Sequence, residues 1–384
     1  MTALRYAVRA LALSLSLTAV GAFCVVGAPS PVQAAGSAPV GGAQLGQAGI
    51  IVNLKAGVPA PPAMPGESFL IADMETGQIL AAKAPHTPRL PASTLKTLTA
   101  LTLIPRLDAS AKIMVKPEDV RVEGSRLGIL PGTAYGVPTL FQGLLMASGN
   151  DAAYTLARAN QSVAVTLGEM NATATGLGAF DTVAKDPSGL DKPGQTSSAY
   201  DLALIGRAAM KLPNFRTYVS TKQASVPGGR SLEGKTLPGF KINNHNTLLY
   251  NYDGAIGIKN GYTVAAKQTF MGAATRGSKT YIVTEMASPN GSWRPTAALL
   301  DWAFAHGATL TPIGELVEPG AATRPGLTSA APGLTSAAGG LTSAKATESA
   351  RMTGRRPWIG VAGLVGGVVL VGAYAARRTT RRRS

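Results

Sequence analysis

The chain has 384 residues, 45% of them hydrophobic, which is enough for one large domain with further segments at both ends. Its single cysteine, Cys24, excludes an internal disulfide framework and a cysteine-rich zinc site, and its three histidines show no metal-ligand spacing. The formal net charge of +16 lies mostly in the ends. Residues 35–344 carry 25 basic and 19 acidic residues and are therefore only mildly basic. They contain no run of basic residues interleaved with aromatic ones, so nucleic-acid binding is not predicted.

The first 34 residues predict a secretory signal peptide. Arg5 and Arg9 give a basic start, an apolar run follows, and a small-x-small triplet ends at Ala34, where cleavage is expected. A retained membrane anchor is the alternative, which the serines and glycines of the apolar run disfavour. Residues 35–64 are rich in Ala, Gly and Pro and predict a flexible lead-in.

Residues 65–310 predict a single catalytic domain. Its first element is a hairpin, because two apolar runs flank the turn residues Glu75-Thr76-Gly77. Apolar residues at helical spacing then predict a mostly helical middle. The helices expected there cover Ser93–Leu107, Thr139–Arg158 and a segment capped by Ser198.

The end of this domain predicts an antiparallel meander and a closing helix. Three apolar runs, "GAIGIKNGYT", "QTFMGAAT" and "KTYIVTEMAS", are joined by short polar turns, and the helix that follows ends at Gly307. The first hairpin can pair with these strands. The expected fold class is therefore α/β (α+β), an antiparallel sheet flanked by helices beside a mostly helical lobe.

The C-terminal segments predict attachment to a membrane. Residues 311–356 contain three copies of "GLTSA" among glycines and prolines, which is typical of a tether. Residues 357–376 carry no charge and predict a transmembrane helix, roughly 28 Å long. The arginines of residues 377–384 favour the cytoplasmic side. We therefore expect a single-pass cell-membrane protein with its catalytic domain on the cell-wall side.

Ser93 and Lys96 are a candidate reacting pair. Residues three apart share one face of a helix, and a neutral lysine amine there could accept the proton of the serine hydroxyl. Burial or a neighbouring cation would have to keep that amine neutral. An isolated pair of this kind is more often a solvated helix face, so other residues must decide between the two interpretations.

Two further motifs favour catalysis. Ser148-Gly149-Asn150 interrupts an apolar stretch, where polar side chains need buried partners or a task. Lys259-Asn260-Gly261 lies at the end of a predicted strand, unlike the other Lys-x-Gly triplets, which lie in loop-like sequence. Together with Ser93 and Lys96, these residues resemble the three motifs of penicillin-binding proteins and serine β-lactamases.

Segments around the motifs narrow the resemblance. "LLMASGNDAA", "SGLDKPGQTSSAYDLALI" and "NNHNTLLYNYDGAIGIKNGYT" are similar to secreted serine-type D-alanyl-D-alanine carboxypeptidases over residues 65–310. The resemblance implies a transpeptidase fold of the β-lactamase type and no cofactor. It also implies removal of the terminal D-alanine from peptidoglycan stem peptides in cell-wall remodelling, with effects on cell shape, and covalent inhibition by β-lactams.

The resemblance assigns a role to each motif. Ser93 attacks the carbonyl between the D-alanines, Lys96 is its base, Ser148 passes a proton to the leaving amine, and Asn150 orients Lys96. Lys259 helps to keep Lys96 neutral and attracts the substrate carboxylate. The amides of Ser93 and Tyr262 form the oxyanion hole. The substrate-binding segment comprises Lys259, Asn260, Gly261, Tyr262 and Thr263.

Asn260 departs from the family pattern, which usually has Thr or Ser at this position to hold the substrate's terminal carboxylate. An amide NH₂ can also donate a hydrogen bond, so activity is expected, while the grip on the carboxylate and the sensitivity to β-lactams stay open. His245, just before this motif, either assists that carboxylate or is an ordinary loop histidine.

Two other functions share these motifs. A β-lactamase is disfavoured, because no Glu-x-x-x-Asn segment lies between the second and third motifs; the acidic residues near the expected place of such a segment are Asp181, Asp186 and Asp191. A catalytically silent peptidoglycan-binding protein is favoured only by Asn260.

Overall fold

The computed structural model describes residues 38–291 and 293–323. The predicted signal peptide (1–34), the transmembrane helix (357–376), the basic tail (377–384) and most of the predicted tether lie outside the described residues. Within the described ranges, no helix is both long enough and apolar enough to span a bilayer.

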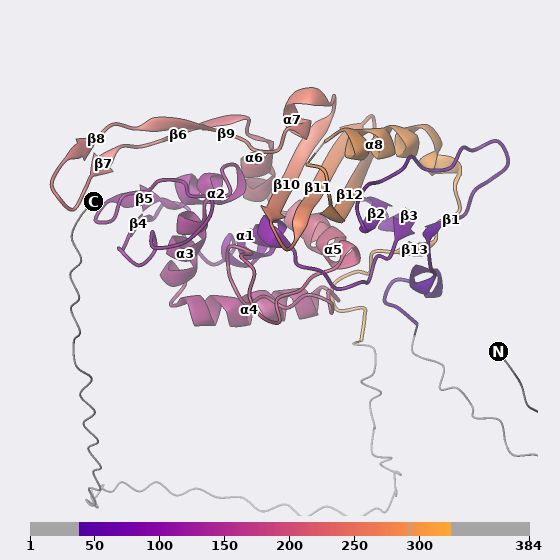
Figure 1. Cartoon of the computed structure of the whole chain (residues 1–384), viewed down its shortest axis with the longest axis horizontal. Coiled ribbons are helices and arrows are strands. Elements are labelled where there is room, and N and C mark those ends of the chain that lie inside the picture. Colours follow the sequence, from indigo (N-terminus) through magenta and orange to yellow (C-terminus); the bar gives the residue numbers. More distant parts are fainter. Residues whose placement is uncertain (1–37, 292, 324–384) are drawn as a thin grey trace, which may run out of the picture. The chain divides into compact units, whose positions relative to one another are not determined.

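A seven-stranded antiparallel sheet organises the structure (Figure 1). The predicted hairpin and the predicted meander join in it, because Ile71 pairs with Val283. The order is β1-β3-β2-β12-β11-β10, and β13 also pairs with β3. The strands are β1 (Ile50–Val52), β2 (Ser68–Asp73), β3 (Gln78–Lys83), β10 (Ala255–Thr263), β11 (Lys267–Arg276), β12 (Lys279–Ser288) and β13 (Gly314–Glu315).

Helices cover both faces of the sheet. Side chains alternate along β2, so Leu70 enters the core beneath α5 (Ala199–Ala209), whereas Phe69 enters the core beneath α8 (Arg294–His306). Figure 1 shows these two helices on opposite sides of the sheet. The predicted start of α5 is confirmed, because Ser198 Oγ accepts from Asp201 N at 3.1 Å. The predicted end of α8 is also confirmed, because this helix ends just before Gly307.

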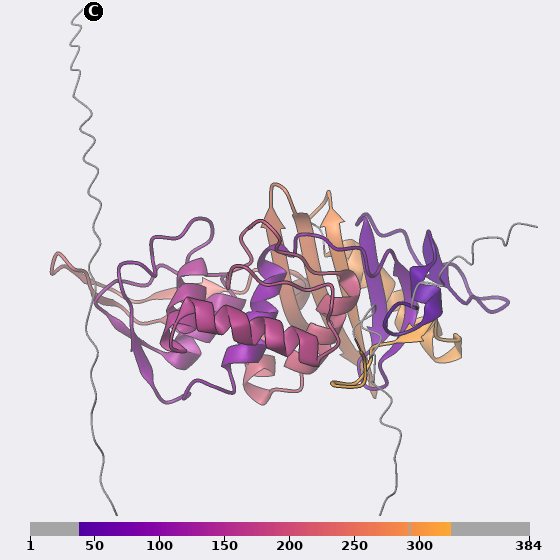
Figure 2. The ribbon, with the colours of Figure 1, turned by 90° about the horizontal axis from the view of Figure 1, so that it is seen from below.

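A helical lobe adjoins the β10 edge of the sheet (Figures 1 and 2). Its central helix, α1, packs against α2, α3, α4 and α5. The predicted α/β fold with a mostly helical lobe is confirmed. The remaining helices are η1 (Ala43–Gly46), η2 (Ala92–Leu95), α1 (Lys96–Leu103), α2 (Val137–Leu145), α3 (Asn150–Ala159), α4 (Val163–Gly176), α6 (Pro213–Ser220), α7 (Leu248–Asn251) and η3 (Gly307–Thr309). Three two-stranded antiparallel sheets lie outside the main sheet: β4 (Lys112–Met114) with β5 (Ala134–Gly136), β6 (Gln223–Val226) with β9 (Phe240–Asn243), and β7 (Gly229–Arg230) with β8 (Thr236–Leu237).

Two predicted helices differ from the observed ones. The single helix expected over Thr139–Arg158 is two helices, α2 and α3, because Ser148 has a positive φ of 58° that breaks the helical path. The helix expected over Ser93–Leu107 begins as the turn η2 and ends at Leu103. Pro105 explains this early end, because a proline has no backbone N–H to donate to the Leu101 carbonyl oxygen and continue the helix.

The folded body extends beyond residues 65–310 at both ends. Part of the predicted flexible lead-in (35–64) forms β1, and Ile51 is buried. The start of the predicted tether (311–356) forms β13, which buries Ile313 and Leu316 on the sheet. Both segments are short apolar runs among glycines and prolines. This flanking composition is typical of flexible segments, so the sequence did not predict these two strands.

Candidate active site

Ser93 and Lys96 contact each other at the junction of the turn η2 and helix α1. Lys96 Nζ lies 2.8 Å from Ser93 Oγ. The lysine side chain is fully buried, while that of Ser93 is partly exposed. The structure therefore favours a reacting pair over two residues on a solvated helix face.

The other contacts of Lys96 suit a neutral amine. Its Nζ donates to Asn150 Oδ1 at 2.7 Å and to the Ser188 carbonyl oxygen at 2.6 Å. Both atoms can only accept, so they take the two N–H groups of a neutral amine. The remaining lone pair then faces the Ser93 hydroxyl, which is the arrangement that a general base needs.

The electrostatics of the site also favour a neutral Lys96 amine. Burial lowers the pKa of Lys96 well below the usual lysine value, and the charge of Lys259 lowers it further. The carboxylates of Asp186 and Asp151 oppose this shift. Lys259 is itself fully buried, and burial lowers its pKa to about 7. The charge of the distant third motif thus acts on Lys96.

The second motif forms the turn between α2 and α3. Ser148 holds a left-handed backbone conformation, which is strained for a residue with a side chain and is often found at functional sites. Its side chain is only 5% exposed, and its hydroxyl makes no hydrogen bond to any residue that the structure describes. Asn150 begins α3 and is anchored, because its Nδ2 donates to the Glu123 carbonyl oxygen at 2.6 Å.

The third motif lies on β10, an edge strand of the sheet. A Cβ on Gly261 would lie 2.7 Å from the amide nitrogen of Ser93, so the two backbones touch here. Only glycine permits this approach, which brings the next residue, Tyr262, beside Ser93. The Tyr262 side chain is 58% exposed. The oxyanion hole from these two amides stays a prediction, with the backbone contact in its favour.

The remaining residues of the third motif are placed as follows. Lys259 Nζ donates to the Asn260 carbonyl oxygen at 2.7 Å and to Asn260 Oδ1 at 3.2 Å. This leaves the amide NH₂ of Asn260 as a donor for an anion. Thr263 Oγ1 donates to Asp191 Oδ1 at 3.0 Å, so its hydroxyl is occupied by the "SGLD" segment. Desolvation and the charge of Lys259 lower the pKa of His245.

Two carboxylates that the sequence analysis did not assign support the site. Asp186 accepts from Ser188 N at 2.7 Å and from Tyr154 Oη at 2.6 Å, which positions the carbonyl that binds Lys96. Asp151 accepts from Leu127 N at 2.7 Å and holds the loop that borders Asn150. Asp151 directly follows the second motif and Asp186 precedes "SGL", but neither position reveals its partners.

Gly261→Ala tests the contact between β10 and η2. The new methyl group would meet the backbone nitrogens of Ser93 and Thr94, neither of which can move away without shifting a whole element. We expect the rate at which a β-lactam modifies Ser93 to fall at least about tenfold, and we expect the melting temperature of the variant to be lower. Gly168→Ala is the matched control, since no heavy atom lies within 4 Å of its Cβ position. Full reactivity in Gly261→Ala would contradict the contact.

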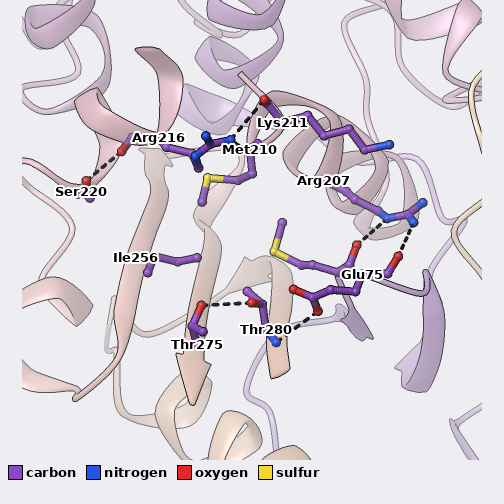
Figure 3. A pocket seen from close by; sticks show the side chains of 10 residues that line it. Glu75, Arg207, Met210, Lys211, Arg216, Ser220, Ile256, Thr275 and Thr280 are labelled. Carbon is purple, nitrogen blue, oxygen red and sulfur yellow. Dashed lines mark hydrogen bonds between the residues drawn. The ribbon is translucent and has the colours of Figure 1, made fainter. Parts of the chain in front are cut away.

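A separate cavity of about 480 Å³ lies at the other end of the same sheet (Figure 3). Arg207 of α5 and Met210, the residue that follows this helix, border it opposite Ile256 of β10, and Figure 3 shows Met210 directed into the space between them. None of the predicted site residues lines it. The chemistry of the three motifs therefore does not involve this cavity.

Comparisons with known proteins agree with this site. The family described as D-alanyl-D-alanine carboxypeptidase matches residues 55–290, which include all three motifs. The chain is 41% identical over 255 residues to D-alanyl-D-alanine carboxypeptidase DacB2 of Mycobacterium tuberculosis, which covers 65% of this chain and 85% of the relative.

Solved structures show the same similarity. A D-alanyl-D-alanine carboxypeptidase from Mycobacterium tuberculosis aligns with a TM-score of 0.64 and 38% identity, over 69% of this chain and 99% of that chain. The DD-transpeptidase of Streptomyces K15 aligns with a TM-score of 0.60 and 32% identity, over 64% of this chain and 99% of that chain.

Proposed function

The chain belongs to the D-alanyl-D-alanine carboxypeptidase family, and on this premise we propose how its residues carry out the reaction. It is a serine peptidase with the fold of penicillin-binding DD-peptidases. The substrate class is the peptidoglycan stem peptide ending in D-Ala-D-Ala. One observation supports the roles most directly: the buried Lys96 amine lies 2.8 Å from Ser93 Oγ with its other two positions taken by acceptors.

In the acylation step, Ser93 Oγ attacks the carbonyl between the two D-alanines while Lys96 takes the hydroxyl proton. The oxygen of the tetrahedral intermediate is stabilised by the amides of Ser93 and Tyr262, each worth about 3 kcal/mol of barrier. The C–N bond then breaks, and Ser148 transfers a proton to the leaving amine. Water, activated by Lys96, hydrolyses the Ser93 ester and restores the serine.

Lys259 and Asn260 bind the terminal carboxylate of the substrate. The ammonium group of Lys259 supplies positive charge in a buried site, and the free NH₂ of Asn260 replaces the hydroxyl that relatives usually carry there. Asparagine at this position therefore still offers a donor for the carboxylate, and we prefer the enzyme to a catalytically silent binding protein.

The proposal predicts a bell-shaped dependence of kcat/KM on pH. Activity rises as pH increases through the pKa of Lys96, because only the neutral amine is a base. It falls above about pH 7, because Lys259, with its pKa lowered to about 7, then loses the charge that binds the carboxylate. We expect Lys259→Met to have a lower kcat/KM without this alkaline decline. An unchanged decline in the variant would contradict the assignment.

Incubation with an acylated peptide ending in D-Ala-D-Ala tests the function itself. The account predicts stoichiometric release of one D-alanine and slow recovery from β-lactam acylation. Binding without release would support the wall-binding alternative, and rapid β-lactam turnover would support the β-lactamase alternative.

We also propose that the protein works on the cell-wall side of the membrane, where this substrate lies. The signal-like N-terminus and the uncharged segment 357–376 support this location. Degradation of the catalytic domain by protease added to intact spheroplasts tests it, and full protection there would contradict it.

A further inference from the structure

A cavity of about 580 Å³ opens beside the second motif. It is bounded by the loop between β4 and β5, by the Ser148 turn and by strand β9 with the residues that follow it. Its lining consists of Ser125, Arg126, Leu127, Ala147, Phe240, Lys241, Ile242, Asn243 and His245. Ala147 is the neighbour of Ser148, so the cavity adjoins the reacting centre.

The loop that forms one wall is held in place from both sides of Arg126. Asn150 N donates to the Ser125 carbonyl oxygen at 2.8 Å, and Asp151 Oδ1 accepts from Leu127 N at 2.7 Å. The second motif and the residue after it thus hold the backbone that carries this arginine.

The opposite wall is tied to the same turn. Lys241 lies on β9, which pairs with β6, and His245 N donates to the Met146 carbonyl oxygen at 2.9 Å. The two walls also meet away from the reacting centre, where a Cβ on Gly128 would lie 3.7 Å from the Phe240 ring. The cavity is therefore preformed, and its position relative to Ser148 is set by hydrogen bonds.

The cavity is lined by cations without counter-ions. Arg126 and Lys241 are its two fixed charges, and no carboxylate lines it. Both side chains are exposed, and neither forms a hydrogen bond or ion pair with any residue in the part of the chain that the structure describes. Such a lining favours an anionic ligand. Because neither cation has to give up an ion pair within the described part of the chain, the binding free energy of the anion is not reduced by breaking one.

The position of the cavity places that ligand on the leaving-group side of the scissile bond. Ser148, next to Ala147, transfers a proton to the leaving amine in the proposed mechanism. His245 lines both this cavity and a small one of about 100 Å³ that is also lined by Asn260, the residue assigned to the terminal carboxylate. At about 580 Å³, the cavity is far larger than the methyl group of D-alanine.

We propose that the chain also accepts residues with an acidic side chain on the leaving-group side, held by Arg126 and Lys241 beside the Phe240 ring. This rests on the proposed function and extends its substrates from D-Ala-D-Ala to D-alanyl amides of carboxylate-bearing residues larger than alanine. The bonds change as in the main reaction: Ser93 Oγ bonds to the carbonyl carbon, the C–N bond breaks, and the larger amine leaves with one proton.

The test compares two peptides that differ only in charge. Acylated peptides ending in D-Ala-D-Glu and D-Ala-D-Gln have leaving residues of nearly equal size, so the ratio of their kcat/KM values measures the carboxylate alone. We expect a ratio of about ten, equivalent to about 1.4 kcal/mol. The preference should weaken with added salt, because both cations are exposed.

Variants of the two cations assign the preference to this cavity. The double variant Arg126→Glu with Lys241→Glu should bring the ratio to one or below, whereas Arg126→Lys with Lys241→Arg should retain it. Lys55→Glu, at an exposed lysine that does not line the cavity, makes a charge reversal elsewhere and should leave the ratio unchanged. If the double reversal fails to fold, the single variants Arg126→Gln and Lys241→Gln should each lower the ratio.

A ratio near one in the native protein, or a ratio that survives the double reversal, would overturn the inference. These outcomes differ from failure of the proposed function itself. If the native protein does not release D-alanine from D-Ala-D-Ala, the proposed function fails. If it releases D-alanine without preferring D-Ala-D-Glu, only the inference fails.

Discussion

Replacing Ser93 with alanine is expected to abolish D-alanine release, with kcat lowered by at least about 10⁴-fold. The remaining residues can still bind the peptide through Lys259, but no oxygen remains to form the acyl ester. Lys96 would lose one contact and keep two, to Asn150 Oδ1 and the Ser188 carbonyl oxygen. We therefore expect the fold to persist and the substrate to bind without being cleaved.

The measurement combines the rate of D-alanine release with intact mass after exposure to a β-lactam. Native protein should gain one β-lactam adduct, and Ser93→Ala should gain none. Ser110→Ala is a suitable control, because that serine is exposed and its hydroxyl bonds only to Asp108 among the residues that the structure describes. Release at the native rate by Ser93→Ala would mean that another group is the nucleophile.

Replacing Lys96 with methionine is expected to lower the acylation rate by about 10² to 10⁴-fold, the usual contribution of a general base. Methionine fills most of the same buried volume, so the loss would report chemistry. The stability should change little, because two effects oppose each other. A costly buried amine is removed, while Asn150 Oδ1 and the Ser188 carbonyl oxygen lose their donor at about 1 to 3 kcal/mol for each group.

Rates of β-lactam acylation across a range of pH would measure this effect. The acid limb that the native protein shows should be absent in Lys96→Met. Lys112→Met is the matched control, since Lys112 is exposed and lies on β4 outside the site. An acylation rate within about threefold of native would exclude Lys96 as the base.

The sequence predicted the order of the elements. Short-range patterns were sufficient for this: apolar runs separated by polar turns predicted the hairpin and the meander, and the Ser93 and Lys96 spacing predicted one shared face. The resemblance supplied the expectation that Lys259 reaches the pair. The structure brings it there because β10 packs against the turn η2, where Gly261 touches the Ser93 amide.

Other features depend on contacts that no local pattern reveals. The carbonyl of Ser188 binds Lys96 across 92 positions of sequence, and Asp186 positions that carbonyl. The left-handed backbone of Ser148 divides a helix that is continuous by apolar periodicity alone. Similarly, the pairing of β13 with β3 places residues 314 and 315 in the sheet although their surroundings resemble a tether.

The central claim is that burial and the charge of Lys259 keep Lys96 neutral near Ser93 at neutral pH. Titration of the protein carrying ¹³C-labelled lysine, observed by NMR and assigned with Lys96→Met, measures this directly. The account predicts that the Lys96 side-chain signal is that of a neutral amine at pH 7 and titrates well below ordinary lysines, with an upward shift of its pKa in Lys259→Met. A Lys96 signal that titrates together with the exposed lysines would contradict the account.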